Sequence, residues 1–190
     1  IVHYLNIDKQ KIEVVYQGCH SIFKNTYRDE DLLRVKQKYN LPDEFILNVG
    51  TIESRKNALT IVKALVSSDT KLPLVIVGKA TLYVKQLQEY IQAHHLSNCV
   101  RLIHTIPFTD LPLIFRAAKV FVYPSLFEGF GIPIVEAIAS GVPVISSIGS
   151  CFSEAGGPDC IYVDPKNHEA LGIAICEVLS NPDRSNNMIT

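Results

Sequence analysis

The sequence predicts an α/β fold in which a parallel sheet carries helices on both faces. Short apolar runs rich in Val and Ile recur along the chain, and the distance between them leaves room for a helix. These runs show little alternation of apolar and polar residues, as expected for strands that are buried on both faces. Because the intervening stretches have apolar residues at helical spacing, strands and helices alternate, which is typical of parallel sheets.

Seven apolar runs are candidate strands, and each is followed by a polar residue, a glycine or a proline. They are Ile12–Tyr16, Phe45–Val49, Leu74–Val77, Val100–Ile103, Val120–Tyr123, Val142–Ser146 and Cys160–Val163.

Four stretches between or after these runs show apolar side chains at the 3.6-residue period of a helix. They are residues 58–66, 87–94, 111–118 and 171–179. Asn57 and Asp110 precede two of them and are expected N-caps. A further, nearly all-apolar helix follows Gly131, and Gly141 is expected to end it.

The first 44 residues have a different character from the rest. They hold one strand-like run and a charged helical stretch, Asp29–Tyr39, before the regular alternation begins near Phe45. We interpret 1–44 as a linker with an extra layer and 45–190 as the core domain. The abrupt start and the polar stretch 181–190 suggest a piece excised from a longer protein.

Composition limits the class of protein. The chain is 47% hydrophobic and 19% charged, as in globular proteins with a large core. The net charge of −1 does not favour nucleic acid or an anionic membrane as a partner. Five cysteines, odd in number and without CxxC spacing, indicate reduced thiols in a cytosolic protein. No cluster of Cys and His predicts a metal site.

The loops that follow the predicted strands carry the candidate site, because ligands of an open parallel sheet bind beyond the carboxyl ends of its strands. Gly50 allows the backbone to approach a ligand, and Arg55 and Lys56 place two cations beside a helix N-terminus, which suits a diphosphate. An exposed Arg-Lys pair is the simpler alternative. Gly78 permits a close approach or an ordinary turn. Ile106 offers an apolar ledge for a nucleobase, or an ordinary connection.

Residues 124–141 form the most informative segment. A predicted strand ends there in a glycine-rich turn, and an apolar helix leaves the turn. Gly129 and Gly131 admit tight backbone geometry, so that their amides and that of Phe130 can point at an anion near the positive end of the helix dipole. Pro133 suits the first helical turn.

Two carboxylates, Glu128 and Glu136, flank this turn with seven residues between them. Glu136 lies among apolar neighbours and needs hydrogen-bond donors, because burying an unpaired carboxylate is costly. The vicinal hydroxyls of a ribose offer two donors, and Arg or Lys would serve the same need. Glu128 precedes the turn, where a sugar attached to the phosphates would lie. The alternative is that both glutamates make internal salt bridges or caps.

Three competing motifs are absent from the sequence. Without G-x-G-x-x-G the chain lacks the fingerprint of an NAD-linked oxidoreductase, and without G-x-x-x-x-G-K-S/T it is no P-loop NTPase. No serine lies in a G-x-S-x-G elbow.

A set of short motifs occurs in a characteristic order along the chain. They are Gly50, Arg55–Asn57, Phe115–Ala118, Val122–Pro133, Glu136–Ala137, Gly141–Val144, Glu154–Gly157 and Val163–Pro165. Together they resemble the retaining glycosyltransferases of family 4, the group 1 glycosyltransferases. The resemblance covers roughly residues 14–179, and the segment with the paired glutamates and the Gly-Phe-Gly turn is its most specific part.

The resemblance implies a Rossmann-like, three-layer α/β/α domain that forms the C-terminal, donor-binding half of a GT-B fold. Residues 45–190 would be the nucleotide-sugar-binding domain and residues 1–44 the interdomain linker. The partner would be an N-terminal acceptor domain of the same polypeptide, and this chain alone would be inactive. Peripheral membrane association through that domain, at the inner face of the membrane, is compatible with the resemblance, as is a purely cytoplasmic location.

The resemblance also implies roles for the site residues. Lys56 contacts the donor diphosphate with Arg55 as its helper, Glu128 contacts sugar hydroxyls, and Glu136 binds the ribose. The amides of Gly129, Phe130, Gly131 and Ile132 hold the distal phosphate and the sugar. The other predicted substrate-binding residues are Gly50, Thr51, Gly78, Ile106 and Ser125.

The implied reaction moves a sugar from a nucleotide-diphosphate sugar to a saccharide or lipid-linked acceptor in polysaccharide or glycoconjugate biosynthesis. It needs no metal and no cofactor, and it proceeds on one face of the sugar without a protein nucleophile. Three positions depart from the family pattern. Thr51 stands where many members carry Arg, Gln17 replaces Asn in an Asn-Gly turn, and His104 stands where the fourth strand often ends in glycine.

Overall fold

The computed structural model describes residues 2–189 of the chain. Its strands are β1 (Ile46–Val49), β2 (Leu74–Val77), β3 (Val100–Ile103), β4 (Val120–Tyr123), β5 (Val144–Ser147) and β6 (Ile161–Val163). Its α-helices are α1 (Val2–Leu5), α2 (Asp29–Lys38), α3 (Ala58–Ser67), α4 (Tyr83–Ala93), α5 (Leu111–Ala117), α6 (Ile132–Ala139), α7 (Phe152–Gly156), α8 (His168–Ser180) and α9 (Pro182–Asn187). Short 3-10 helices are η1 (Lys9–Lys11), η2 (Ser21–Lys24) and η3 (Ser54–Lys56).

The six strands form one parallel sheet in the order β3-β2-β1-β4-β5-β6. Strand order reverses between β1 and β4, so the two crossovers that leave these strands run to opposite sides and open a crevice at their carboxyl ends. The backbone register of β1 and β4 joins Ile46 to Val120 and Leu47 to Phe121. Beyond it, the buried Asn48 donates a side-chain hydrogen bond to the carbonyl of Val122, 2.8 Å away. The amide thus keeps the two strands joined up to the crevice.

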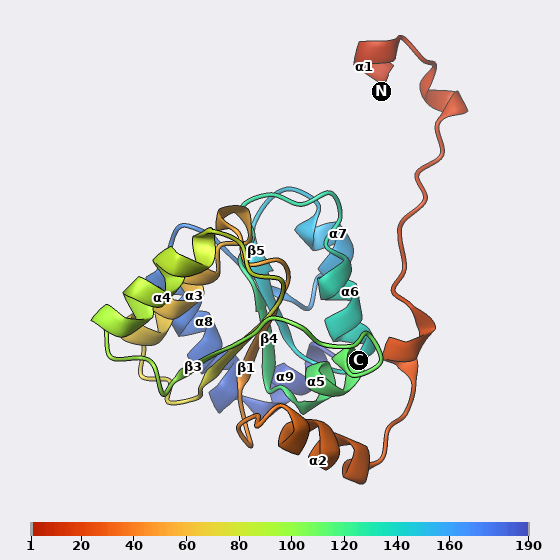
Figure 1. Ribbon diagram of the computed structural model, residues 1–190. Helices are drawn as coiled ribbons and strands as arrows, with labels where there is room; N and C mark the ends of the chain where they lie inside the picture. The colour runs from red at the N-terminus through yellow and green to blue at the C-terminus, as the bar shows by residue number, and fades with distance from the viewer. Residues whose placement is uncertain (1, 190) are drawn as a thin grey trace.

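Helices cover both faces of the sheet, and each face has its own apolar cluster (Figure 1). On one face α3, α4 and α8 bury residues such as Ile61, Leu87 and Ile175 against the strands. On the other face α2, α5, α6 and α7 bury residues such as Phe115 and Phe152. The predicted three-layer α/β/α arrangement is therefore confirmed.

Six of the seven predicted strands are present, with boundaries that differ by no more than two residues. The predicted strand Ile12–Tyr16 is wrong. These residues have no regular secondary structure, and Val14, Val15 and Tyr16 are exposed. An apolar run becomes a strand only when a neighbour completes its ladder of hydrogen bonds. Within residues 2–189 the structure contains no strand before β1.

The segment before β1 runs along the molecule from a distant N-terminus and reaches the body at η2 and α2 (Figure 1). Phe23 anchors it: the side chain is fully buried and makes edge-to-face contacts with Phe108 and Phe115. The helix predicted over Asp29–Tyr39 is confirmed as α2, which packs on α5. The division of the chain at residue 44 stays a prediction.

The expected N-caps occupy the expected positions but do not cap. Asn57 has a left-handed backbone (φ 58°) and its amide donates to the carbonyls of Pro124 and Pro165, 3.0 and 2.7 Å away. Asp110 instead accepts hydrogen bonds from Lys38 and Tyr39. The side-chain oxygen of Asn57, the atom that could cap, accepts instead from the hydroxyl of Thr60 at 2.7 Å. Only at Asp110 do tertiary partners replace the local amides. Gly141 follows the end of α6 with φ 71°, as predicted.

Candidate active site

A cleft of about 730 Å³ lies at the carboxyl ends of β1 and β4, where the strand order reverses. Its two walls come from different parts of the chain. One is the segment Val14–Gln17, and the other is built from Gly129–Pro133 with Cys151 and Glu154. Lys56, Tyr123 and Glu128 also line the cleft. The position agrees with the expectation for a ligand site on an open parallel sheet.

Arg55 and Lys56 meet Glu128 in this cleft. The Lys56 Nζ lies 2.7 Å and the Arg55 guanidinium 2.9 Å from the same oxygen, Oε1 of Glu128. The Lys56 and Glu128 side chains are only 14% and 10% exposed, so solvent screens their attraction weakly. Burial alone would raise the pKa of Glu128, but the hydrogen bonds from Lys56, Ser125 and Arg55 outweigh it and lower that pKa. Glu128 is thus a carboxylate held between two cations.

Arg55 has further partners that tie the loop after β1 to the loop after β4. Its guanidinium lies 2.7 Å from Glu53 and donates to the carbonyl of Phe127 at 2.6 Å. Its own carbonyl accepts a hydrogen bond from the amide of Leu126 at 2.9 Å. These contacts hold the Arg55–Lys56 segment against the residues that lead into the glycine-rich turn. The local charges balance, because two cations face Glu53 and Glu128.

The glycine-rich turn delivers the N-terminus of α6 to the cleft. Gly131 precedes the helix with φ 105°, a conformation that non-glycine residues rarely adopt, and Pro133 occupies its first turn. Gly129 has open space around it and no positive φ. The Phe130 ring stacks on Tyr16, with ring centroids 5.8 Å apart. Free amides at a helix N-terminus are a seat for an anion.

Glu136 lies one turn into α6 and differs from Glu128 in its surroundings. Within residues 2–189, no hydrogen bond or ion pair reaches its carboxylate. Burial raises the pKa of this side chain to about 7. The alternative that both glutamates are internally paired therefore holds for Glu128 only, and Glu136 is left with acceptors to satisfy.

The other candidate residues around β1 and β2 contribute mainly to backbone geometry. A Cβ on Gly50 would make an ordinary contact with the aliphatic part of Lys56 at 3.5 Å, but the φ of 150° is one that other residues rarely adopt. A Cβ on Gly78 would lie 1.7 Å from the carbonyl oxygen of Gly50. The close approach that Gly78 permits is therefore to the backbone of Gly50, at the end of β1. The carbonyl of the half-buried Thr51 accepts a hydrogen bond from the amide of Glu53.

Two further candidates do not line the cleft. Ser125 is fully buried beside Glu128, whose pKa its side chain helps to lower, and its carbonyl accepts a hydrogen bond from Ser147. Ile106 is half-buried and packs against the apolar cluster that holds Phe23. The structure thus brings Arg55, Lys56, Ser125, Glu128 and residues 129–132 together. Glu136 lies further along α6 and does not line the cleft, and Ile106 lies outside the group.

The sequence patterns do not point to several residues in and beside the cleft. Tyr123 is predicted only as a strand residue, although its place directly before Pro124 is a signal that it ends β4 at the ligand edge. Glu53 pairs with Arg55 two residues further on, a spacing that was visible. Nothing in the local sequence places Tyr16 beside Phe130, because the two are far apart in the chain.

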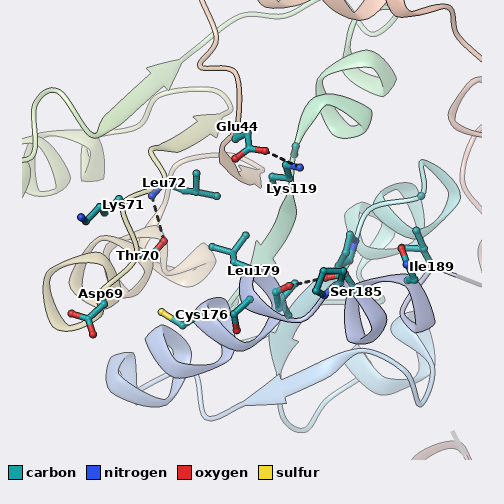
Figure 2. Close-up of a pocket in the computed structure, with 17 residues that line it drawn as sticks. Glu44, Asp69, Thr70, Lys71, Leu72, Lys119, Cys176, Leu179, Ser185 and Ile189 are labelled. Carbon is teal, nitrogen blue, oxygen red and sulfur yellow. Dashed lines mark hydrogen bonds and ion pairs between the residues drawn. The ribbon is translucent and has the colours of Figure 1, made fainter.

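A second cavity, of about 760 Å³, lies at the amino ends of the strands, at the opposite end of the sheet from the cleft. It is bounded by the start of β1 and by the helices α8 and α9 (Figure 2). Its lining mixes apolar side chains such as Leu179 with charged ones, and Glu44 and Lys119 form an ion pair of 2.9 Å there. None of the candidate site residues lines it. This cavity is slightly larger than the cleft, but the predicted site residues lie at the cleft.

Two kinds of feature are absent from residues 2–189. No helix in this part of the chain combines the length and the apolar composition needed to cross a bilayer. The same residues contain no group of three or more His, Cys, Asp or Glu side chains placed to hold a metal ion.

A family model described as glycosyl transferases group 1 matches residues 29–190. The chain belongs to this family. The group 1 glycosyltransferase domain seen here has the Rossmann-like three-layer fold that the resemblance implied, and its structural neighbours are GT-B glycosyltransferases.

Two curated relatives of this group 1 domain are mannosyltransferases of O-antigen chains. One, RfbU of Salmonella typhimurium, is 32% identical over 187 residues, which are 97% of this chain and 50% of that protein. The other, mannosyltransferase B of Escherichia coli, is 31% identical over 186 residues, 95% of this chain and 49% of that protein. The chain therefore spans about half the length of the curated relatives it matches.

Solved structures show the same fold. A glycosyltransferase from Rickettsia africae superposes with a TM-score of 0.89 at 22% identity, over 99% of this chain and 52% of that one. HepE of Anabaena, solved in complex with UDP and glucose, gives a TM-score of 0.82 at 22% identity, over 93% of this chain and 51% of that one. At this identity the likeness establishes the fold of the group 1 domain alone.

Proposed function

We propose that the chain is the C-terminal, donor-binding domain of a retaining glycosyltransferase that moves a sugar from a nucleotide-diphosphate sugar to a saccharide or lipid-linked acceptor. The observation that carries the proposal is the meeting of Arg55, Lys56 and Glu128 beside the N-terminus of α6. Cations and free helix amides suit a diphosphate, and the carboxylates suit sugar hydroxyls.

The roles of the residues follow from their positions. Lys56 and Arg55 neutralise the negative charge that develops on the departing diphosphate, which in this proposal replaces a metal ion or any other cofactor. Glu128 accepts hydrogen bonds from hydroxyls of the transferred sugar. Glu136, which has no protein partner among residues 2–189, accepts two hydrogen bonds from the ribose.

The bond changes of the proposed reaction balance without a protein nucleophile. The bond between C1 of the sugar and the phosphate oxygen breaks, and its electron pair leaves with the diphosphate. The acceptor hydroxyl forms the new bond to C1 on the same face, and its proton passes to the departing phosphate oxygen. The protein then has to stabilise the departing charge, which is the role of Arg55 and Lys56, and to align the two substrates, which requires the acceptor-binding domain as well.

Mannose is the first sugar to test as the transferred group, because several relatives are named mannosyltransferases. The O-antigen names of two of them support a place in polysaccharide biosynthesis. The relatives' greater length supports a further domain of the same polypeptide as the acceptor-binding partner. We propose the cytoplasm, or the inner face of a membrane reached through that domain, as the site of action.

A non-catalytic nucleotide-sugar-binding module is the second candidate function. The paired cations and the unpaired Glu136 argue against it, because a module without turnover has no need to hold charge for a leaving diphosphate.

Calorimetry on the complete protein with UDP, GDP and NAD as ligands tests the proposal. We expect binding of at least one of the two nucleoside diphosphates and none of NAD. A protein that binds NAD but neither UDP nor GDP would refute the donor-binding role. Incubation with a panel of nucleotide sugars and a saccharide acceptor then separates a transferase, which releases the nucleoside diphosphate, from a binding module, which does not.

A further inference from the structure

Tyr123 combines complete burial with a polar contact in the cleft. It is the last residue of β4, and its side chain has no exposed surface. Its ring stacks on Phe121, with centroids 5.6 Å apart. The phenol oxygen accepts a hydrogen bond from the Lys56 Nζ at 2.6 Å, and the ammonium lies 5.0 Å from the ring centroid. A rigid strand residue thus holds the end of a flexible side chain.

Lys56 has two partners of different charge. One is the carboxylate of Glu128 and the other is the neutral hydroxyl of Tyr123. A donor phosphate that reaches Lys56 competes with the carboxylate, because two anions repel each other beside one cation. The hydroxyl carries no charge at neutral pH, since burial, and secondarily the charge of Glu128, raises the pKa of Tyr123 far above its usual range. The Tyr123 contact can therefore persist while the anion changes.

We propose that Tyr123 is a positioning residue of the donor site, whose hydroxyl keeps the Lys56 ammonium in place whether Glu128 or a nucleoside diphosphate occupies its other side. The proposal rests on the proposed function, because it requires an anion at Lys56. Lysine loses much rotamer freedom when it is ordered. A side chain already held by the protein binds its ligand more tightly, because that loss occurs before the ligand arrives.

The removal of the hydroxyl alone tests this role. We expect Tyr123→Phe in the complete protein to weaken UDP or GDP binding about tenfold in calorimetry, the effect of one hydrogen bond with a charged partner. The melting temperature should stay close to that of the wild type, because the ring keeps its packing. Tyr162→Phe is the matched control: it removes a hydroxyl that donates to the carbonyl of Gly157, and it should leave the affinity unchanged.

A double-mutant cycle with Lys56→Met separates positioning from a general structural effect. If Tyr123 acts through Lys56, Tyr123→Phe weakens nucleotide binding in the wild-type background and has no further effect once Lys56 is replaced. For variants that bind too weakly for calorimetry, the rise in melting temperature at millimolar nucleotide provides the comparison.

The outcomes separate the Tyr123 proposal from the donor-binding function on which it rests. A wild-type protein that binds neither UDP nor GDP refutes the donor-binding role and the Tyr123 role with it. A wild type that binds, and that Lys56→Met weakens while Tyr123→Phe does not, overturns the Tyr123 proposal alone. Equal losses from Tyr123→Phe in both backgrounds also overturn it, because they indicate a structural effect that does not pass through Lys56.

Discussion

Glu128 and Glu136 have the same side chain but opposite surroundings. The cations beside Glu128 lower its pKa, whereas burial without a partner raises that of Glu136 to about 7. A half-buried carboxylate without a protein partner lowers the stability of the folded protein when it is ionised, because its desolvation is not compensated. The proposed ribose contact would supply the missing hydrogen-bond donors.

Folding stability should fall as pH rises through the titration of Glu136. Below about pH 4.5, its ordinary pKa, the carboxyl is protonated in both states, and up to about pH 7 only the folded protein keeps the proton. Glu136→Gln removes this dependence. We expect its melting temperature to match the wild type near pH 4.5 and to exceed it at pH 8. At pH 8 it should also weaken UDP or GDP binding by about tenfold, since it removes a charged acceptor.

The control for Glu136 is Glu89→Gln. Glu89 lies on an exposed face of α4, so its replacement should change neither the melting temperature nor the affinity. A Glu136→Gln variant that melts lower than the wild type at pH 8 would show that the carboxylate is internally paired. Unchanged nucleotide affinity in a folded variant would rule out the ribose contact.

At the scale of elements, the ends of β1 and β2 meet closely at a pair of glycines. Because a Cβ on Gly78 would overlap the Gly50 carbonyl, the two strand ends require glycine there. This contact fixes the path of the loop that carries Arg55 and Lys56. The close approach predicted at Gly78 therefore acts on the candidate site indirectly, through the path of this loop.

Gly78→Ala should destabilise the domain. The methyl group has to push apart two paired strands, and we expect a loss of about 3 kcal/mol in the free energy of unfolding measured in urea. Gly129→Ala is the matched control, because open space surrounds Gly129 and its φ is not positive. It should stay within about 0.5 kcal/mol of the wild type. A Gly78→Ala variant as stable as the control would contradict the close-packing argument.

At the scale of the whole molecule, the cleft has one wall from the body and one from the segment Val14–Gln17. That segment exposes Val14, Val15 and Tyr16 and makes a single stacking contact with Phe130 among the aromatic pairs found in residues 2–189. In the proposed function this chain binds the donor, and a further domain of the longer protein aligns the acceptor with it. Alignment of the two reactants supplies a large part of the rate of a transfer reaction.

The isolated chain of 190 residues should therefore bind a nucleoside diphosphate weakly and transfer no sugar. The complete protein, assayed at the same molar concentration as the isolated chain, should release UDP or GDP from its donor when acceptor is present. A coupled assay measures this release. Sugar transfer by the isolated chain would show that the donor domain suffices and would refute the need for a partner domain.

Much of this protein could be predicted from local patterns. The apolar runs of β1 to β6 and the helical stripes depend on periodicity, so the layers and nearly all strand boundaries followed from the sequence. The run at Ile12–Tyr16 failed because its composition suits a strand but no neighbour is present to pair with it. Asp110 failed as a cap because partners distant in sequence bind its carboxylate. Asn57 failed because its side-chain oxygen accepts from the Thr60 hydroxyl while its amide nitrogen donates to distant carbonyls.

The sequence by itself determined the fold class, the family and the edge of the sheet where the site lies, since these depend on patterns within short segments. Only the tertiary structure decided that Glu128 is paired with Lys56 and Arg55, that Glu136 is unpaired, and that Tyr123 holds Lys56. Those contacts join residues separated by about 70 positions. Such contacts depend on strand order and register, which create proximity that no local pattern encodes.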